Sequence, residues 1–129
     1  MSYLSYLQSE LAEKKEQLER LKSCATELDG YQAEFSQNQH LVKDPDLSGT
    51  TWKGNLADKF IDIREDMEGV YKDLSGYQLD TAITAIENKI ATIKAEIQSL
   101  QVAISAEIAR IEREEREERE RERAKARNK

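Results

Sequence analysis

Large apolar residues recur at alternating spacings of three and four along most of the chain, and this regularity limits the fold more than any other feature. From Leu4 to Phe35, only Lys14 and Gln32 interrupt the apolar positions. A spacing that averages 3.5 residues keeps one stripe of a helix turned toward a partner helix. The pattern therefore predicts an all-α chain that begins with a heptad helix over residues 1–42.

A turn is predicted over residues 43–54. This stretch contains the only proline, two of the five glycines and a cluster of serine and threonine. Such a cluster between two periodic segments is typical of a loop, and the hydroxyl groups of Ser48, Thr50 or Thr51 are each able to cap the helix that follows. We therefore expect the chain to fold back here as an elongated antiparallel helical hairpin.

The second helix is predicted over residues 55–111, with an apolar stripe that changes phase once. One stripe runs from Leu56 to Tyr77, and an isoleucine-rich seam offset by two residues starts at Leu79. Gly76 lies at the offset, and glycine costs about 1 kcal/mol inside a helix, so we expect a kink or a break near residues 75–80, with the kink favoured. The isoleucine seam consists of Ile83, Ile86, Ile90, Ile93, Ile97, Leu100, Ile104, Ile108 and Ile111.

The register of the hairpin follows from an equal rise per residue on both helices. With the turn centred on residues 46–48, Phe35 faces Ile61 and Ile63, and the first helix ends before it reaches the stretch from Ile97 to Ile111. Each of these side chains would contribute about 1.5–3 kcal/mol if it were buried. The seam is therefore predicted to bind a partner, either a second copy or a different helical protein. Isoleucine at both kinds of heptad position favours assemblies of three or four helices.

The charged residues point to a solvated surface. Residues 112–129 alternate glutamate and arginine, often with glutamate four positions before arginine, which predicts a solvated helical tail. The charges of the tail nearly balance, and the whole chain has a net charge of −6. A nucleic-acid arm is therefore the weakest of the functions considered, and binding to heparin would test it.

The side chains needed for catalysis are scarce. Cys24 and His40 are each the only residue of their type, and no glycine-rich phosphate loop is present. We expect no enzymatic activity, no cofactor and no metal site. The chain also has neither a signal peptide nor an apolar run long enough to cross a membrane, so we expect it in the cytoplasm.

The turn and its surroundings resemble a known family. Trp52-Lys53-Gly54 at the head of the second helix is similar to the Trp-x-Gly motif of WXG-type hairpins, the small helical proteins of type VII secretion. A wider pattern resembles the branch encoded beside LXG polymorphic toxins in Gram-positive bacteria. It comprises Phe35, Asn38, Leu41, Pro45, Leu47, Thr51, Trp52, Lys53, Gly54, Phe60, Arg64 and Tyr71.

The resemblance implies a function in protein export. Members of this branch act as partners of the toxin's helical LXG domain, together with a second small helical protein in some cases. Such a partner would keep the toxin soluble and export-competent, and would either stay in the cytoplasm or leave with it. The family's Tyr-x-x-x-Asp/Glu export signal after the second helix is missing, since the single match begins at Tyr6. A homo-oligomeric coiled-coil scaffold without a secretion role is the alternative.

Trp52 and Gly54 form the predicted turn motif. Tryptophan at the tip of a hairpin is able to cover the open end of the seam, and glycine allows a close approach of the backbone. Whether the motif stabilises the turn or recognises a partner is left open by the sequence.

Overall fold

The computed structural model describes residues 2–44 and 54–128, and these residues are helical almost throughout. No strand occurs among them, which confirms the predicted all-α fold. Trp52 and the rest of residues 45–53 lie outside the described part. The described elements are α1 (Tyr3–Asn38), the 3-10 helix η1 (Gln39–Lys43), α2 (Asn55–Lys72), the π-helical segment η2 (Asp73–Gln78) and α3 (Leu79–Arg127).

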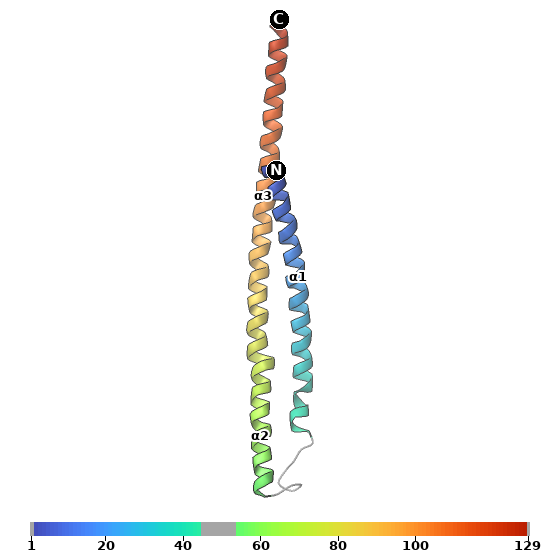
Figure 1. Cartoon of the computed structure of the whole chain (residues 1–129), viewed down its shortest axis with the longest axis vertical. Coiled ribbons are helices and arrows are strands. Elements are labelled where there is room, and N and C mark those ends of the chain that lie inside the picture. Colours follow the sequence, from blue (N-terminus) through green and yellow to red (C-terminus); the bar gives the residue numbers. More distant parts are fainter. Residues whose placement is uncertain (1, 45–53, 129) are drawn as a thin grey trace. The chain divides into compact units, whose positions relative to one another are not determined.

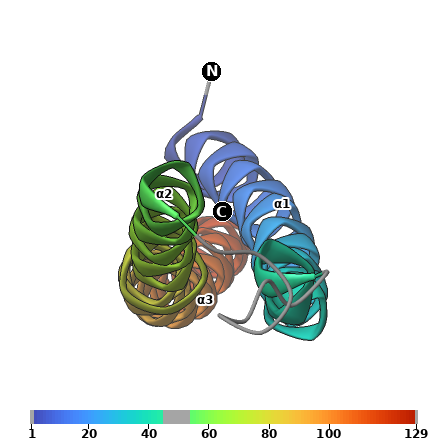
Figure 2. The ribbon, with the colours of Figure 1, turned by 90° about the horizontal axis from the view of Figure 1, so that it is seen from below.

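The chain forms two compact units. The terminal unit combines Met1–Arg20 with Ile90–Lys129, and the central unit comprises Leu21–Lys89. In the terminal unit the start of α1 lies beside α3, and in the central unit the end of α1 lies opposite α2, where Phe35 meets Tyr71 (Figure 1). Figure 2 shows the helices end on. The paired segments run in opposite directions within each unit, as expected for the predicted antiparallel helical hairpin.

The first apolar stripe packs as expected. All its members from Leu4 to Phe35 are buried or half-buried, and Leu7 has 4% of its surface exposed. In the terminal unit the main buried residue of α3 is Ile93, with 1% of its surface exposed. Lys14, one of the two polar interruptions of the stripe, has its Nζ 2.6 Å from Glu96 Oε2 on α3. This hydrogen bond raises the pKa of Lys14 above its usual value.

The predicted register is wrong by roughly ten residues, or about 15 Å of helix. Phe35 does not face Ile61 and Ile63; its ring meets Tyr71 edge-on, with centroids 5.4 Å apart. The Arg64 Nε–H group donates to the carbonyl oxygen of Val42 at 2.8 Å in the same register. Both pairs of facing residues are symmetric about a point near Gly54 and not about residues 46–48, although α2 begins at Asn55 as predicted.

The inner face of α2 is not the apolar stripe that the sequence suggested. Ala57 and Ser75 are buried, and four residues between them are half-buried: Ile61, Arg64, Glu68 and Tyr71. Each residue of the apolar stripe from Leu56 to Leu74 directly precedes one of these inner residues. Successive residues are about 100° apart around a helix, so the stripe is turned away from the face that packs in the central unit.

The π-helical segment η2 lies where a kink or break was expected. The backbone stays helical through Asp73–Gln78, so the chain does not break at Gly76. Gln32, the second polar interruption of the first stripe, lies against this segment. Its Nε2 donates to the carbonyl oxygen of Ser75 at 2.8 Å and to Asp80 Oδ1 at 2.6 Å. Both polar interruptions therefore have partners on the opposite arm of their own unit.

Candidate interaction surfaces

Most residues of the isoleucine seam are buried or half-buried within the chain's own fold. Ile83 and Ile93 are buried, and Ile108 is the most exposed residue of the seam, at 38%. Because the register is shifted by about ten residues, α1 reaches residues of α3 that were expected to lack a partner. Leu100 is one of them, and it lines a groove in the terminal unit together with Tyr6 and Lys14 of α1. The remaining seam residues are half-buried: Ile86, Ile90, Ile97, Leu100, Ile104 and Ile111.

The apolar stripe of α2 and η2 is the main exposed apolar surface of the central unit. Its members have between 36% and 74% of their surface exposed. We call this surface the α2 stripe, and it consists of Leu56, Phe60, Ile63, Met67, Val70, Leu74 and Tyr77. Sequence reasoning found these residues, but placed the candidate binding surface on the isoleucine seam.

A shallow groove of about 400 Å³ runs along the middle of the α2 stripe. Tyr71 forms one side of the groove and is positioned by the edge-on contact with Phe35. The one charged residue in the lining is Asp66, whose side chain is exposed. The lining residues are Ile63, Asp66, Met67, Val70, Tyr71 and Leu74. This shape suits apolar side chains of a second helix, accompanied by one cationic group.

Gly54 is the described residue of the predicted turn motif. It precedes α2 with a φ of 110°, and its carbonyl oxygen accepts a hydrogen bond from the Asp58 amide at 3.0 Å. A Cβ atom at this position would have no neighbour within 4 Å. The glycine is therefore required by its backbone conformation, which other residues rarely adopt, and the close backbone approach that was expected is not seen among the described residues.

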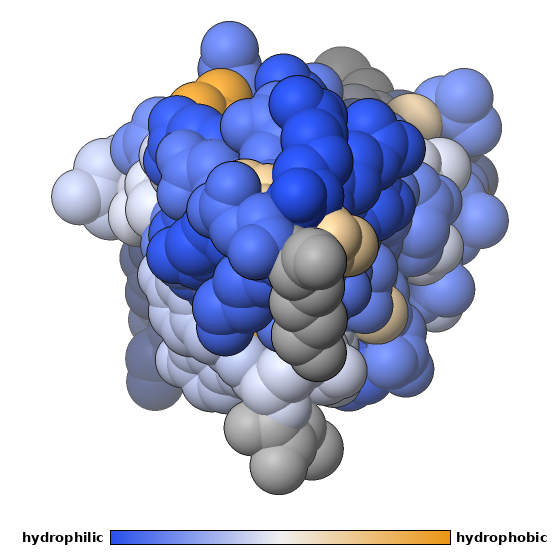
Figure 3. Space-filling view, turned by 90° about the horizontal axis from the view of Figure 1, so that it is seen from above, coloured by the Kyte–Doolittle hydropathy of each residue, from blue (hydrophilic) through white to orange (hydrophobic). Residues whose placement is uncertain are grey.

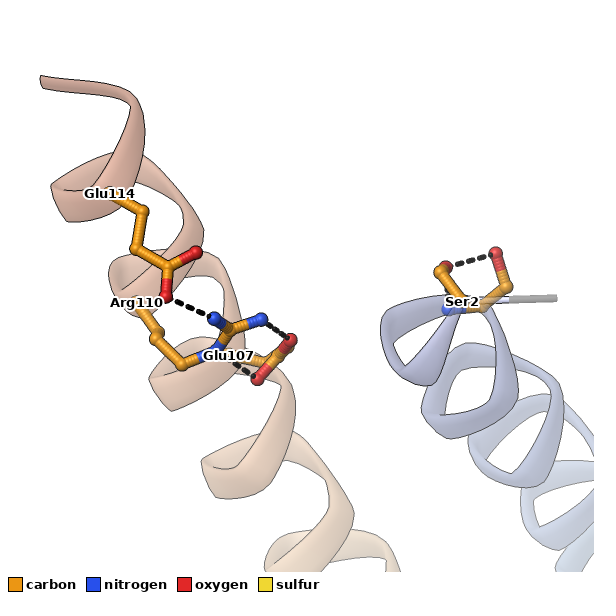
Figure 4. A network of polar contacts seen from close by, with 5 residues as sticks. Ser2, Glu107, Arg110 and Glu114 are labelled. Atoms are coloured by element: carbon orange, nitrogen blue, oxygen red, sulfur yellow. Dashed lines mark hydrogen bonds and ion pairs between the residues drawn. The ribbon is translucent and has the colours of Figure 1, made fainter. Parts of the chain in front are cut away.

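A polar cluster lies where α3 passes into the charged tail. Arg110 lies between Glu107 and Glu114 (Figure 4), and its guanidinium group donates to both carboxylates over 2.6–3.0 Å. The hydrogen bond from Arg110 lowers the pKa of Glu107, and the two carboxylates raise the pKa of Arg110. From residue 112 onward the described residues are exposed, and hydrophilic residues dominate the view from above (Figure 3). This part of α3 is a solvated helix.

The cluster predicts an acid-sensitive contribution to stability. Because the pKa of Glu107 is lower in the folded protein than in the unfolded chain, the stabilisation is present above about pH 4.3 and is lost as the pH falls through the lowered value. We expect Arg110→Met to reduce helix content or thermal stability at neutral pH, measured by circular dichroism. The difference from wild type should vanish in acid, whereas Arg119→Met, in the exposed tail, should have little effect at either pH. A deficit of Arg110→Met that persists in acid would contradict an ionic role.

The residues considered for chemistry are scattered. Cys24 is exposed on α1, and His40 Nδ1 lies 2.9 Å from the carbonyl oxygen of Gln37. Within residues 2–44 and 54–128, no three His, Cys, Asp or Glu side chains are grouped as metal ligands. None of the helices described here combines the length and the apolar character that crossing a membrane requires.

Comparison with known proteins identifies a family that the chain matches. The family model described as YwqH-like matches residues 2–115, which is most of the chain. Protein YxiB of Bacillus subtilis (strain 168) is 39% identical over 49 residues, which cover 38% of this chain and 40% of YxiB. The chain thus spans well under half the length of that relative. No solved structure matches the chain.

Proposed function

The chain belongs to the YwqH-like family, and on this premise we propose that it is a non-enzymatic helical partner in type VII secretion. It binds the helical LXG domain of a toxin in the cytoplasm, keeps that domain soluble and export-competent, and either remains there or leaves the cell with it. The WXG-like residues around the turn, with Trp52 and Gly54 at their centre, support the link to this secretion route.

The exposed α2 stripe is the observation that carries the proposal. Soluble monomers rarely expose a contiguous apolar surface larger than a few hundred Å², and the α2 stripe runs over more than five helical turns. A protein with such a surface gains stability and solubility by packing against another helix. The partly exposed end of the isoleucine seam, at Ile108 and Ile111, adds a second, smaller contact.

Co-expression tests the proposed function. We expect an LXG toxin gene beside the gene for this chain, and we expect the N-terminal helical domain of that toxin to co-elute with the chain in size exclusion. The toxin domain alone should aggregate or express poorly, and an LXG domain from an unrelated toxin serves as the control. A toxin domain that is soluble alone and elutes separately from the chain would contradict the proposal. A defined homo-oligomer that ignores the toxin would favour the scaffold alternative.

A further inference from the structure

The α2 stripe and the inner face of α2 lie on different sides of the same helix, so only one of them is able to pack against the end of α1. Val70 is 71% exposed, while the next residue, Tyr71, packs on Phe35. Because neighbouring residues are about 100° apart around a helix, no rotation of α2 buries both faces against the end of α1. The exposed stripe therefore follows from the way α2 packs, and the end of α1 does not cover it.

The exposed area is large enough for a specific interface. With residue surfaces of about 150–250 Å², the exposed fractions of the stripe amount to roughly 800 Å², close to what one partner contributes to an interface of standard size. The groove at Ile63, Met67 and Leu74 lies at the middle of this area. The centre of an interface is where buried anchors contribute most of the binding energy.

Charge decides between a second copy and a different partner. Asp66 and Asp73 lie on the edge of the stripe turned away from the inner face, one heptad apart. Two antiparallel copies crossing between Met67 and Val70 would bring Asp66 of one copy beside Asp73 of the other. Like charges placed together at an apolar interface are costly. Parallel copies would instead bring Lys59 beside Arg64, which again places like charges together.

The remaining charges of α2 point the same way. Aspartate and glutamate outnumber lysine and arginine along Asn55–Lys72. Lys72 pairs with Glu68 at 2.9 Å, which cancels one charge of each sign, and Arg64 donates to the Val42 carbonyl oxygen from the inner face of α2. The field around the stripe is therefore negative and attracts a cationic partner.

We propose that the groove of the α2 stripe receives an amphipathic α-helix of another protein, and that this helix carries a lysine or arginine beside its apolar stripe which pairs with Asp66. The inference deepens the proposed function and rests on it only for the identity of that protein. The predicted contact is apolar at Ile63, Met67, Val70 and Leu74, with the cation at the rim.

Two valines provide a matched test of the apolar contact. Val70 and Val102 are 71% and 65% exposed, so neither Val70→Asp nor Val102→Asp should disturb the fold, which circular dichroism checks. We expect Val70→Asp to weaken capture of the adjacent toxin's LXG domain by about tenfold or more, and Val102→Asp to leave it unchanged. Equal capture by wild type and both variants would overturn the inference while leaving the proposed function intact.

Two aspartates provide the matched test of charge. Asp66 lines the groove, whereas Asp62, also on α2, is exposed outside it. Asp66→Lys should weaken capture and remove much of its dependence on salt, and Asp62→Lys should do so much less. An Asp66→Lys variant that binds as tightly as wild type would overturn the proposed cation.

Synthetic peptides separate this inference from the proposed function. The probes are two amphipathic helices with the same leucine stripe, one flanked by lysine and one by glutamate. Wild type should bind the lysine peptide and Val70→Asp should not; this result supports the inference even if the toxin domain is never captured. Binding to neither peptide, together with capture that Val70→Asp leaves unaffected, would overturn it.

Two results would assign the groove to another occupant. A wild-type dimer by light scattering that Val70→Asp converts to a monomer would overturn the inference in favour of a second copy. Tighter peptide binding after Trp52→Ala would overturn it in favour of the chain's own residues 45–53.

Discussion

Replacing Ile93 by alanine is expected to lower the free energy of unfolding by about 2–5 kcal/mol. Ile93 is the largest fully buried side chain among the described residues, with 1% of its surface exposed. Its removal loses the transfer free energy of the deleted groups and leaves a cavity in a thin helical interface. Urea unfolding followed by circular dichroism measures the loss. Wild type and variant are compared with the same dependence of the unfolding free energy on urea concentration.

Ile108 provides the control within the same seam. It lies one residue past the heptad position equivalent to Ile93, which falls on Glu107, and it is 38% exposed, so Ile108→Ala should cost less than about 1 kcal/mol. Equal losses for the two variants would show that the observed pairing of α1 with α3 is not the one in solution.

Replacing Gln32 by alanine is the second change with a large expected effect. The Gln32 amide donates hydrogen bonds to the Ser75 carbonyl oxygen and to Asp80. Ser75 is buried in the π-helical segment, so its carbonyl group is costly to leave without a partner. We expect a loss of about 1–3 kcal/mol in the free energy of unfolding, measured by thermal or urea denaturation.

Two further variants define what Gln32 does. Gln17 bonds only to Glu13 on its own helix, at 3.4 Å, and Gln17→Ala should change stability by less than about 0.5 kcal/mol. Gln32→Leu restores the apolar stripe but not the hydrogen bonds, so it should also be less stable than wild type. If Gln32→Leu were more stable, Gln32 would be a simple interruption of the seam and its bond to η2 would not matter.

Much of the fold could be read from residue spacing. The first stripe, from Leu4 to Phe35, is buried or half-buried as predicted. The change of phase near Gly76 marks the position of the π-helical segment. Lys14 and Gln32 were visible as interruptions, but their partners Glu96 and Asp80 were not, because a sequence pattern shows which position is polar and not which distant group faces it.

The exposure of the two apolar surfaces was predicted less well than the fold. The isoleucine seam from Ile83 to Ile111 drew attention because isoleucine is so frequent there, yet most of it packs within the hairpin. The α2 stripe was recognised as apolar, but it was not expected to remain exposed. The signal that could have found it is its offset from the seam, since one continuous helix cannot turn two offset stripes toward the same neighbour.

The amino-acid sequence by itself determined that the chain is helical, that it turns back once, and that its second arm carries two apolar faces out of phase. These properties depend on local spacing, which each helix expresses independently of its neighbours. The tertiary structure alone decided which face packs and which remains exposed. That choice depends on the rotation and register of one helix against another, and these are set by contacts between distant residues, such as Phe35 with Tyr71 and Gln32 with Ser75.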